Sequence, residues 1–449
     1  MIIMKNFIKQ IIYLVFFMAT VMFIGCENRL VDLEPQQSLS PEAALSTAAN
    51  VQNVLIGTYN EAGQTPIYGG RLNLASELLA NSGELNWQGT PIPPREFNIK
   101  AITTTNSFVQ NAWLNAYKVN NQANLVIANK DNFNDVSEQN RVEGEAKFLR
   151  GLIYFDLARF FGTTYETGQT NNQLGAPIIL GAISDASQVS EPARNTVEEL
   201  YAQVINDLSD AYNLLPATND IFADKYAAQA LLARVYLQQG DFIAARDASD
   251  DVIQYSGHSL ASVFANAFNN DEDSNEDIFA WQITSQDGVN GMNTFWANSA
   301  NGGRGDVTVT DDYFNLFTDA DDRSTFFYDA GFSTKWQSQF ANVTFLRLAE
   351  MYLIRAESNQ RLGTTLGATP IDDINILRLR ANAPNIAVDL DVILLERRKE
   401  LGFEGHRLHD IKRLKGTVGT LNYDADNLVF PIPQREMDVN PNLDQNSGY

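Results

Sequence analysis

The sequence has almost no cysteine, little histidine and a deficit of positive charge. Cys26 is the only cysteine among 449 residues, so an intrachain disulfide and a cysteine-cluster metal site are both excluded. Three histidines leave little material for a histidine-rich metal site. Lysine and arginine number 32 against 55 aspartate and glutamate residues, which gives a net charge of -23. Such an acidic chain repels phosphate backbones and anionic lipid headgroups, which disfavours nucleic acid and a basic membrane-binding patch.

The N-terminal apolar run, Ile11 to Ile24, is too short to span a bilayer, which takes about 20 residues. It follows Lys5 and Lys9, so residues 1–25 are predicted to be a secretory signal peptide. The run ends directly before Cys26 and resembles a bacterial lipobox, in which the cysteine becomes the lipidated first residue. We therefore predict lipidation of Cys26; the alternative is an ordinary signal peptide followed by a free cysteine.

Apolar residues at helical spacing dominate the rest of the chain and predict a mainly α-helical fold. Residues 26–40 are polar and are predicted to be a tether, and residues 41–449 are predicted to form a single domain. The predicted helices are 41–59, 107–130, 137–161, 196–215, 225–239, 242–255, 343–362, 370–382 and 390–401.

Three of these helices share a small residue followed three positions later by tyrosine. The pairs are Gly151 with Tyr154, Ala233 with Tyr236, and Ala349 with Tyr352. This pattern is close to the tetratricopeptide signature, in which the small residue lets two helices approach and the tyrosine fills the groove between them. The spacing between the tyrosines is too long for a tandem array, so we expect divergent helix pairs interrupted by insertions. Chance occurrence in amphipathic helices is the alternative for any one copy.

Two insertions differ in composition from the helices. Residues 63–105 are rich in Gly, Pro, Asn and Thr, and residues 257–339 are rich in Asn, Asp, Gly and Ser. We predict loops with short strands in both regions. Long loops in a compact helical protein usually carry function.

Four motifs in order along the chain resemble the SusD/RagB family. They are Gly144 to Gly162, Arg347 to Glu357, Glu396 to Arg413, and the C-terminal segment from Phe430 to Tyr449. The resemblance implies a mainly helical fold in which tetratricopeptide-like helix pairs form a scaffold and irregular loops carry the ligand site. It also implies an outer-membrane lipoprotein that faces the cell exterior, binds oligosaccharides or peptides, and delivers them to a SusC-like TonB-dependent barrel transporter.

The predicted ligand site lies in the two insertions, where aromatic side chains stand among amides. Flat sugar faces pack on aromatic rings, and sugar hydroxyls pair with amide and charged groups. The candidates are Trp87, Trp296, Asn86, Asn298 and Arg95. We expect both indoles to face one groove; the alternative for each is a loop plug packed on the scaffold. Trp281 and Trp336 are predicted to be core residues.

No local motif marks a catalytic site, so we expect a non-enzymatic binding protein without cofactor or metal. His406 with His409 could face zinc, and the acid cluster Asp271 to Asp277 could hold calcium, but scaffold contacts and a solvated loop explain these residues better. A peptide-binding member of the same family, a cell-surface glycosidase and a helix-repeat scaffold without a small ligand are the alternatives.

Overall fold

Helices dominate the computed structural model, which describes residues 45–449 except 287, 319 and 330. The long helices are α3 (Ala48–Gly63), α6 (Ser107–Ala128), α7 (Val136–Phe161), α8 (Val197–Leu214), α9 (Lys225–Gln239), α10 (Phe242–Tyr255), α13 (Leu348–Leu362), α14 (Pro370–Arg380) and α15 (Leu390–Glu400). The predicted mainly α-helical fold is confirmed, and most boundaries agree within a few residues. Among the described residues, no helix has both the length and the apolar character needed to cross a membrane.

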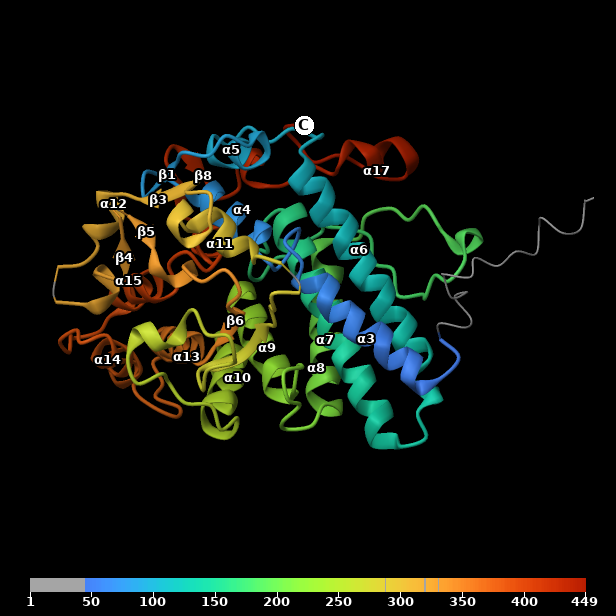
Figure 1. The fold of residues 1–449 in the computed structure, drawn as a ribbon, viewed down its shortest axis with the longest axis horizontal. Coiled ribbons are helices and arrows are strands. Elements are labelled where there is room, and N and C mark those ends of the chain that lie inside the picture. The colour runs from blue at the N-terminus through green and yellow to red at the C-terminus, as the bar shows by residue number, and fades with distance from the viewer. Residues whose placement is uncertain (1–44, 287, 319, 330) are drawn as a thin grey trace, which may run out of the picture. The chain divides into compact units, whose positions relative to one another are not determined.

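The scaffold is built from helix pairs (Figure 1). Helix α7 packs on α8, α9 on α10 and α13 on α14, and the pairs are joined because α8 also packs on α9 and α10 on α13. The three helices with the small-residue and tyrosine pattern are α7, α9 and α13, so each of them opens one pair. The predicted helix-pair scaffold with an insertion between the second and third pairs is therefore confirmed.

Glycine allows the close approach of α7 and α8. A Cβ added at Gly151 would lie 3.0 Å from the Leu208 side chain of α8, and one at Gly144 would lie 2.8 Å from Leu215. The two glycines are seven residues apart, so both lie on the face of α7 that meets α8. Tyr154 is buried one turn further along and donates its hydroxyl to the carbonyl of Ile179 at 2.9 Å.

Antiparallel two-stranded sheets organise the insertions. The strands pair as β1 (Leu85–Trp87) with β3 (Val307–Val309), β2 (Asp277–Trp281) with β6 (Val343–Arg347), β4 (Phe327–Tyr328) with β5 (Phe332–Ser333), and β7 (Thr417–Val418) with β8 (Leu421–Asn422). The first of these sheets joins the two insertions, and its two strands are more than 200 residues apart in the sequence. Trp281 lies on β2 and stacks on Tyr68, and Trp336 is also buried, so both are core residues as predicted.

Two predicted helices begin too early. Residues 45–47 are not helical, so the helix predicted for 41–59 begins at Ala48 within the described residues. Residues 343–347 form strand β6, and helix α13 begins only at Leu348. Val343, Thr344 and Phe345 are β-branched or aromatic, which suits a strand. Pairing with the apolar strand β2 then decides the conformation, because a lone apolar run of this length is compatible with either structure.

Several short helices lie outside the predicted ones, four of them in the regions predicted as loops and two near the C-terminus. These are α4 (Arg71–Ala80), α5 (Ile92–Asn98), α11 (Gly291–Trp296), α12 (Asp311–Phe314), α16 (Arg407–Arg413) and α17 (Gln434–Val439). Helix α5 shows why the spacing of apolar residues does not predict such short helices. Its first turn contains Pro93 and Pro94, which are tolerated there because the first helical N–H groups have no intrahelical partner.

Candidate ligand site

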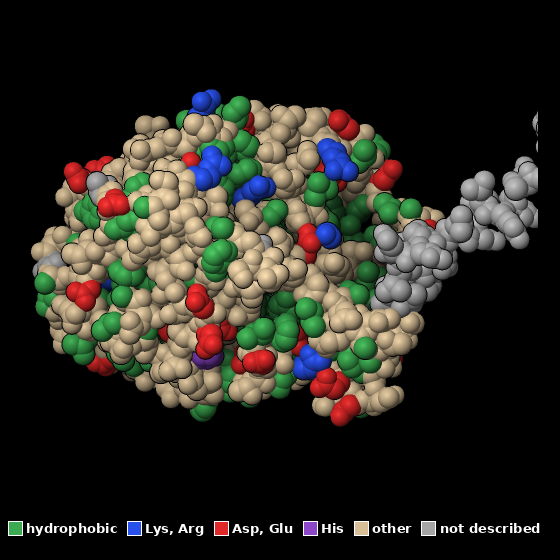
Figure 2. All heavy atoms as spheres, viewed as in Figure 1, with side chains coloured by type: hydrophobic (Ala, Val, Ile, Leu, Met, Phe, Trp, Pro, Cys, Tyr) green, Lys and Arg blue, Asp and Glu red, His purple; other side chains and the backbone are tan. Residues whose placement is uncertain are grey.

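The two insertions meet in a surface region that we call the loop face, made of β1, β3, the β4–β5 hairpin and helix α11. Beyond the strand register, the backbone N–H of Gln88 donates to Asp306 at 2.8 Å, and Val309 donates to Gly331 of the hairpin at 2.8 Å. The scaffold therefore does bring the two predicted ligand loops together. Lysine and arginine side chains are scattered singly over the side of the molecule seen in Figure 2, with no continuous basic patch.

Strand alternation decides how Trp87 and Asn86 are presented. Trp87 lies opposite Val307, on the same side as the buried Leu85, and its indole is half-buried. The ring lies against Gly89, where a Cβ would come within 2.4 Å of it. Asn86 faces the other way and is exposed, and Arg95 is exposed on α5. Ligand contact by these three residues stays a prediction.

Trp296 has a different environment from the one expected. Its exposed fraction is 0%, and its ring packs 5.3 Å from that of Phe403. Helix α11 is held against its neighbours by Asn293, whose amide donates to the carbonyl of Gln337 at 2.9 Å. The indole is therefore a plug between the insertion and the scaffold, and the expectation that Trp87 and Trp296 both face one groove is wrong for this structure.

The side chain of Asn298 forms hydrogen bonds within its own loop and to the β4–β5 hairpin. Its Oδ1 caps the short 3₁₀ helix that follows by accepting from the backbone of Asn301, and its Nδ2 donates to Asp329 at 2.6 Å. Its backbone N–H donates to the hydroxyl of Tyr328 at 3.2 Å. These contacts tie the loop after α11 to the β4–β5 hairpin.

The hairpin supplies two aromatic residues that the sequence argument overlooked. Tyr328 and Phe332 face each other across β4 and β5 with ring centroids 5.7 Å apart, and both rings are half-exposed. Phe332 lies next to Gly305, close to β3. The signal in the sequence was the Phe-Tyr-Asp-Ala-Gly-Phe segment, in which aromatic residues flank a turn.

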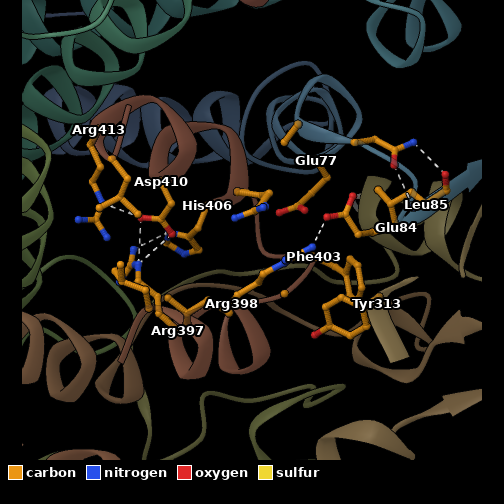
Figure 3. Close-up of a pocket in the computed structure, with 17 residues that line it drawn as sticks. Glu77, Glu84, Leu85, Tyr313, Arg397, Arg398, Phe403, His406, Asp410 and Arg413 are labelled. Atoms are coloured by element: carbon orange, nitrogen blue, oxygen red, sulfur yellow. Dashed lines mark hydrogen bonds and ion pairs between the residues drawn. The ribbon is translucent and has the colours of Figure 1, made fainter. Parts of the chain in front are cut away.

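A charged pocket of about 80 Å³ lies beside the first residues of β1 (Figure 3). It is enclosed by α4, the start of β1, α12, α15 and α16. Glu84 forms an ion pair with Arg398, and Asp410 is held between Arg397, at 2.9 Å, and Arg413, at 2.7 Å. These arginines come from the Glu396–Arg413 motif, so that motif both ties the last helices together and lines a cavity.

Burial changes the protonation of several groups in this pocket. Burial raises the pKa of Glu77 to about 7, and it lowers the pKa of His406 to about 3, so the imidazole is neutral at neutral pH. Burial alone would also raise the pKa of Asp410, but Arg397 and Arg413 outweigh it and hold that pKa well below its usual range.

Neither metal alternative gains support from the geometry. His409 packs edge-on against Phe160 at 4.8 Å, and Glu276 of the acid cluster is paired with Arg347 at 2.7 Å. Within the described ranges, no three His, Cys, Asp or Glu side chains are grouped so as to hold a metal ion. The predicted lipidation site, Cys26, lies outside the described residues, as do the predicted signal peptide and tether.

Comparison with known families identifies the architecture. Residues 31–237 match a family model described as starch-binding associating with outer membrane, and residues 324–429 match the SusD family model. A SusD-like protein P2 from Formosa agariphila is 26% identical, with 95% of this chain and 97% of that protein covered. SusD-like protein P25 from the same organism is 24% identical over the same shares of the two chains.

Solved structures agree with the sequence relatives. A SusD superfamily protein from Bacteroides thetaiotaomicron superposes with a TM-score of 0.81 at 26% identity, covering 89% of this chain and 99% of that one. A putative sugar binding protein from Bacteroides vulgatus gives a TM-score of 0.80 at 27% identity, covering 90% and 99%. The family motifs, the helix-pair scaffold and these matches agree, and the chain belongs to the SusD/RagB family.

Proposed function

We propose that this chain is a glycan-binding protein of the cell surface that captures oligosaccharide at its loop face. The observation that carries the proposal is the β1–β3 pairing, which brings exposed amides and half-exposed aromatic rings from two distant insertions into one region. The family is described as starch-binding, and a solved relative is a putative sugar binding protein; both support the same ligand class.

The proposed contacts divide into aromatic and polar groups. Tyr328 and Phe332 of the hairpin and the free part of Trp87 supply ring surface for C–H faces of sugars. Asn86 and Arg95 supply donors and acceptors for hydroxyl groups, Asn86 from the face of β1 opposite to Trp87. Trp296 does not contact the ligand in this proposal; its buried ring fixes helix α11 and the neighbouring insertion on the scaffold.

The proposed location is the outer membrane, with the protein facing the cell exterior and anchored by lipid on Cys26. Delivery of the ligand to a SusC-like TonB-dependent barrel transporter is the proposed physiological role, as the family resemblance implies. An acidic protein has little affinity of its own for an anionic membrane, so acyl chains are the expected anchor. Cells producing Cys26→Ala should release the protein into the soluble fraction; retention of the variant in outer membranes that lack the transporter would contradict the anchor.

The test of the loop face is affinity gel electrophoresis on a panel of polysaccharides, followed by calorimetry on the best ligand. Tyr328→Ala and Phe332→Ala should each weaken binding about two- to tenfold, because a stacked ring contributes about 0.5–1.5 kcal/mol beyond area burial. Tyr255→Ala is the matched control, since this tyrosine is 69% exposed at the end of α10, outside the loop face.

Other outcomes would change the proposal. Hairpin variants that bind as tightly as the wild type, with normal melting temperatures, would place the ligand elsewhere. Binding of peptides and no glycan would favour the peptide-binding alternative. Protein-dependent release of shorter sugars from the bound oligosaccharide would favour the glycosidase alternative.

A further inference from the structure

A second pocket, of about 250 Å³, is unusual in this acidic protein because cationic side chains line it. It lies where the ends of α9, α13 and α16 meet the start of α10 and the segment after α7. Arg361, Lys412, Arg413 and Lys415 all line it, and none of the described lining residues is Asp or Glu. We call it the cationic pocket.

Three of the four cations already have acidic partners. Arg361 and Arg413 both bind Glu357, at 2.9 and 2.7 Å, and the exposed Lys415 pairs with Glu166. These carboxylates are outside the set of residues that line the pocket, so they neutralise the arginines without contributing acidic groups to its wall.

Lys412 is the exception. The residue is 3% exposed, and its ammonium has no hydrogen-bond partner among the described residues. The nearby charge that acts on it is Arg159, which repels it. A buried ammonium without a counter-charge is costly, and burial accordingly lowers the pKa of Lys412 to about 7. Lys412 is one of the residues that line the pocket, so an anion held there would place a negative charge near this covered ammonium, which the described residues do not.

The size and the other lining groups indicate what kind of anion fits. A volume of about 250 Å³ is far more than one small ion needs, since roughly 10–15 Å³ on the same measure holds a water molecule. Tyr165 and Phe242 are half-exposed and can contact a ring, and Thr167 lies beside them. Aromatic surface next to cations suits an acidic sugar unit.

We propose that the cationic pocket binds the carboxylate group of an acidic sugar unit, with Lys412 as the central charge partner. This site is separate from the loop face and does not depend on the ligand that binds there. A free inorganic anion also presents several negatively charged oxygen atoms. The test must therefore distinguish an acidic sugar from a free inorganic anion.

The test is calorimetry of the purified protein with two pairs of probes. Glucuronate is compared with glucose, and sulfate with chloride at equal ionic strength. We expect glucuronate to bind and glucose not to bind. Stronger binding of sulfate than of glucuronate would assign the pocket to inorganic anions and overturn the acidic-sugar assignment. Absence of binding by both anions would overturn the site altogether.

Lys412→Met tests the central residue, because methionine keeps most of the side-chain volume and removes the charge. It should weaken glucuronate binding about tenfold or more, as expected for the loss of a buried positive charge beside the anion. The variant should fold, since an unpaired buried charge is removed. Lys118→Met is the control, because that side chain is 57% exposed and pairs with Glu61 elsewhere. Unchanged affinity in Lys412→Met would overturn the proposal, whereas Tyr328→Ala should leave this binding intact.

Discussion

Glu77 is a carboxyl group whose protonation is decided by burial. It lines the charged pocket, is 5% exposed, and accepts a hydrogen bond from the backbone of Gly405 at 2.8 Å. Its pKa is about 7 in the folded protein and 4.5 in the ordinary case. Between pH 4.5 and pH 7, Glu77 keeps its proton in the folded state and has lost it in the unfolded state. The stability contributed by this group therefore falls as the pH rises from 4.5 to 7.

Glu77→Gln should remove this pH dependence, because glutamine keeps an oxygen acceptor for Gly405 and never ionises. We expect the variant to match the wild type near pH 4.5 and to be more stable above pH 7. The difference should approach about 1.4 kcal/mol for each pKa unit of the shift. Urea denaturation at several pH values measures it, and a difference that does not vary with pH would contradict the assignment.

At the scale of elements, the α7–α8 contact depends on residues that are unfavourable for an isolated helix. Glycine in a helix interior costs about 0.5–1 kcal/mol relative to alanine. At Gly144 and Gly151 the close packing of α8 outweighs this cost, because a larger side chain would not fit there without strain. Gly57 of α3 differs, since a Cβ added there would meet nothing within 4 Å.

The two kinds of glycine should respond oppositely to substitution. Gly151→Val should destabilise the protein by about 1–3 kcal/mol, because the added atoms must displace Leu208. Gly57→Ala should stabilise it by about 0.5–1 kcal/mol. Thermal melts of the two variants against the wild type provide the measurement. A neutral Gly151→Val would mean that α7 and α8 separate without cost.

At the scale of the whole described unit, a buried ion network links the insertions to the C-terminal helices. Glu400, at the end of α15, meets Arg347 of β6 at 3.1 Å and Arg323 at 3.4 Å, and also pairs with Arg380 of α14. Arg347 and Arg380 in turn bind Glu276, directly before β2. Burial alone would raise the pKa of Glu400, but the arginines outweigh it and hold that pKa far below its usual range.

Glu400→Gln should therefore be strongly destabilising, by about 3–5 kcal/mol, because it removes the carboxylate that three buried guanidinium groups share and leaves their positive charge only partly balanced. The control is Glu138→Gln, which removes a partly exposed partner of Arg141 and should cost at most about 1 kcal/mol. Chemical denaturation compares them. Similar losses in the two variants would show that the network stabilises the unit no more than a surface ion pair does.

The helical scaffold could be predicted in detail because its signals are local. Apolar spacing, the cap residues and the glycine after α9 all act within a few positions, and helices α9 and α10 begin and end where expected. The small-residue and tyrosine pattern marked the first helix of each pair for the same reason. The functional expectation, by contrast, came from family motifs, and those motifs lie in the scaffold and say nothing about the ligand.

The sequence by itself determined the fold class, the helix pairs and the two insertions, because each of these follows from residues close together in the chain. Only the tertiary structure decided that Trp296 is buried while Tyr328 and Phe332 reach the surface, because exposure depends on which distant segments cover a side chain. It also decided that residues 343–347 form a strand, and that Lys412 lies buried beside a pocket without an acidic partner. Strand pairing and charge pairing both join residues far apart in the sequence, and chain packing alone brings them within reach.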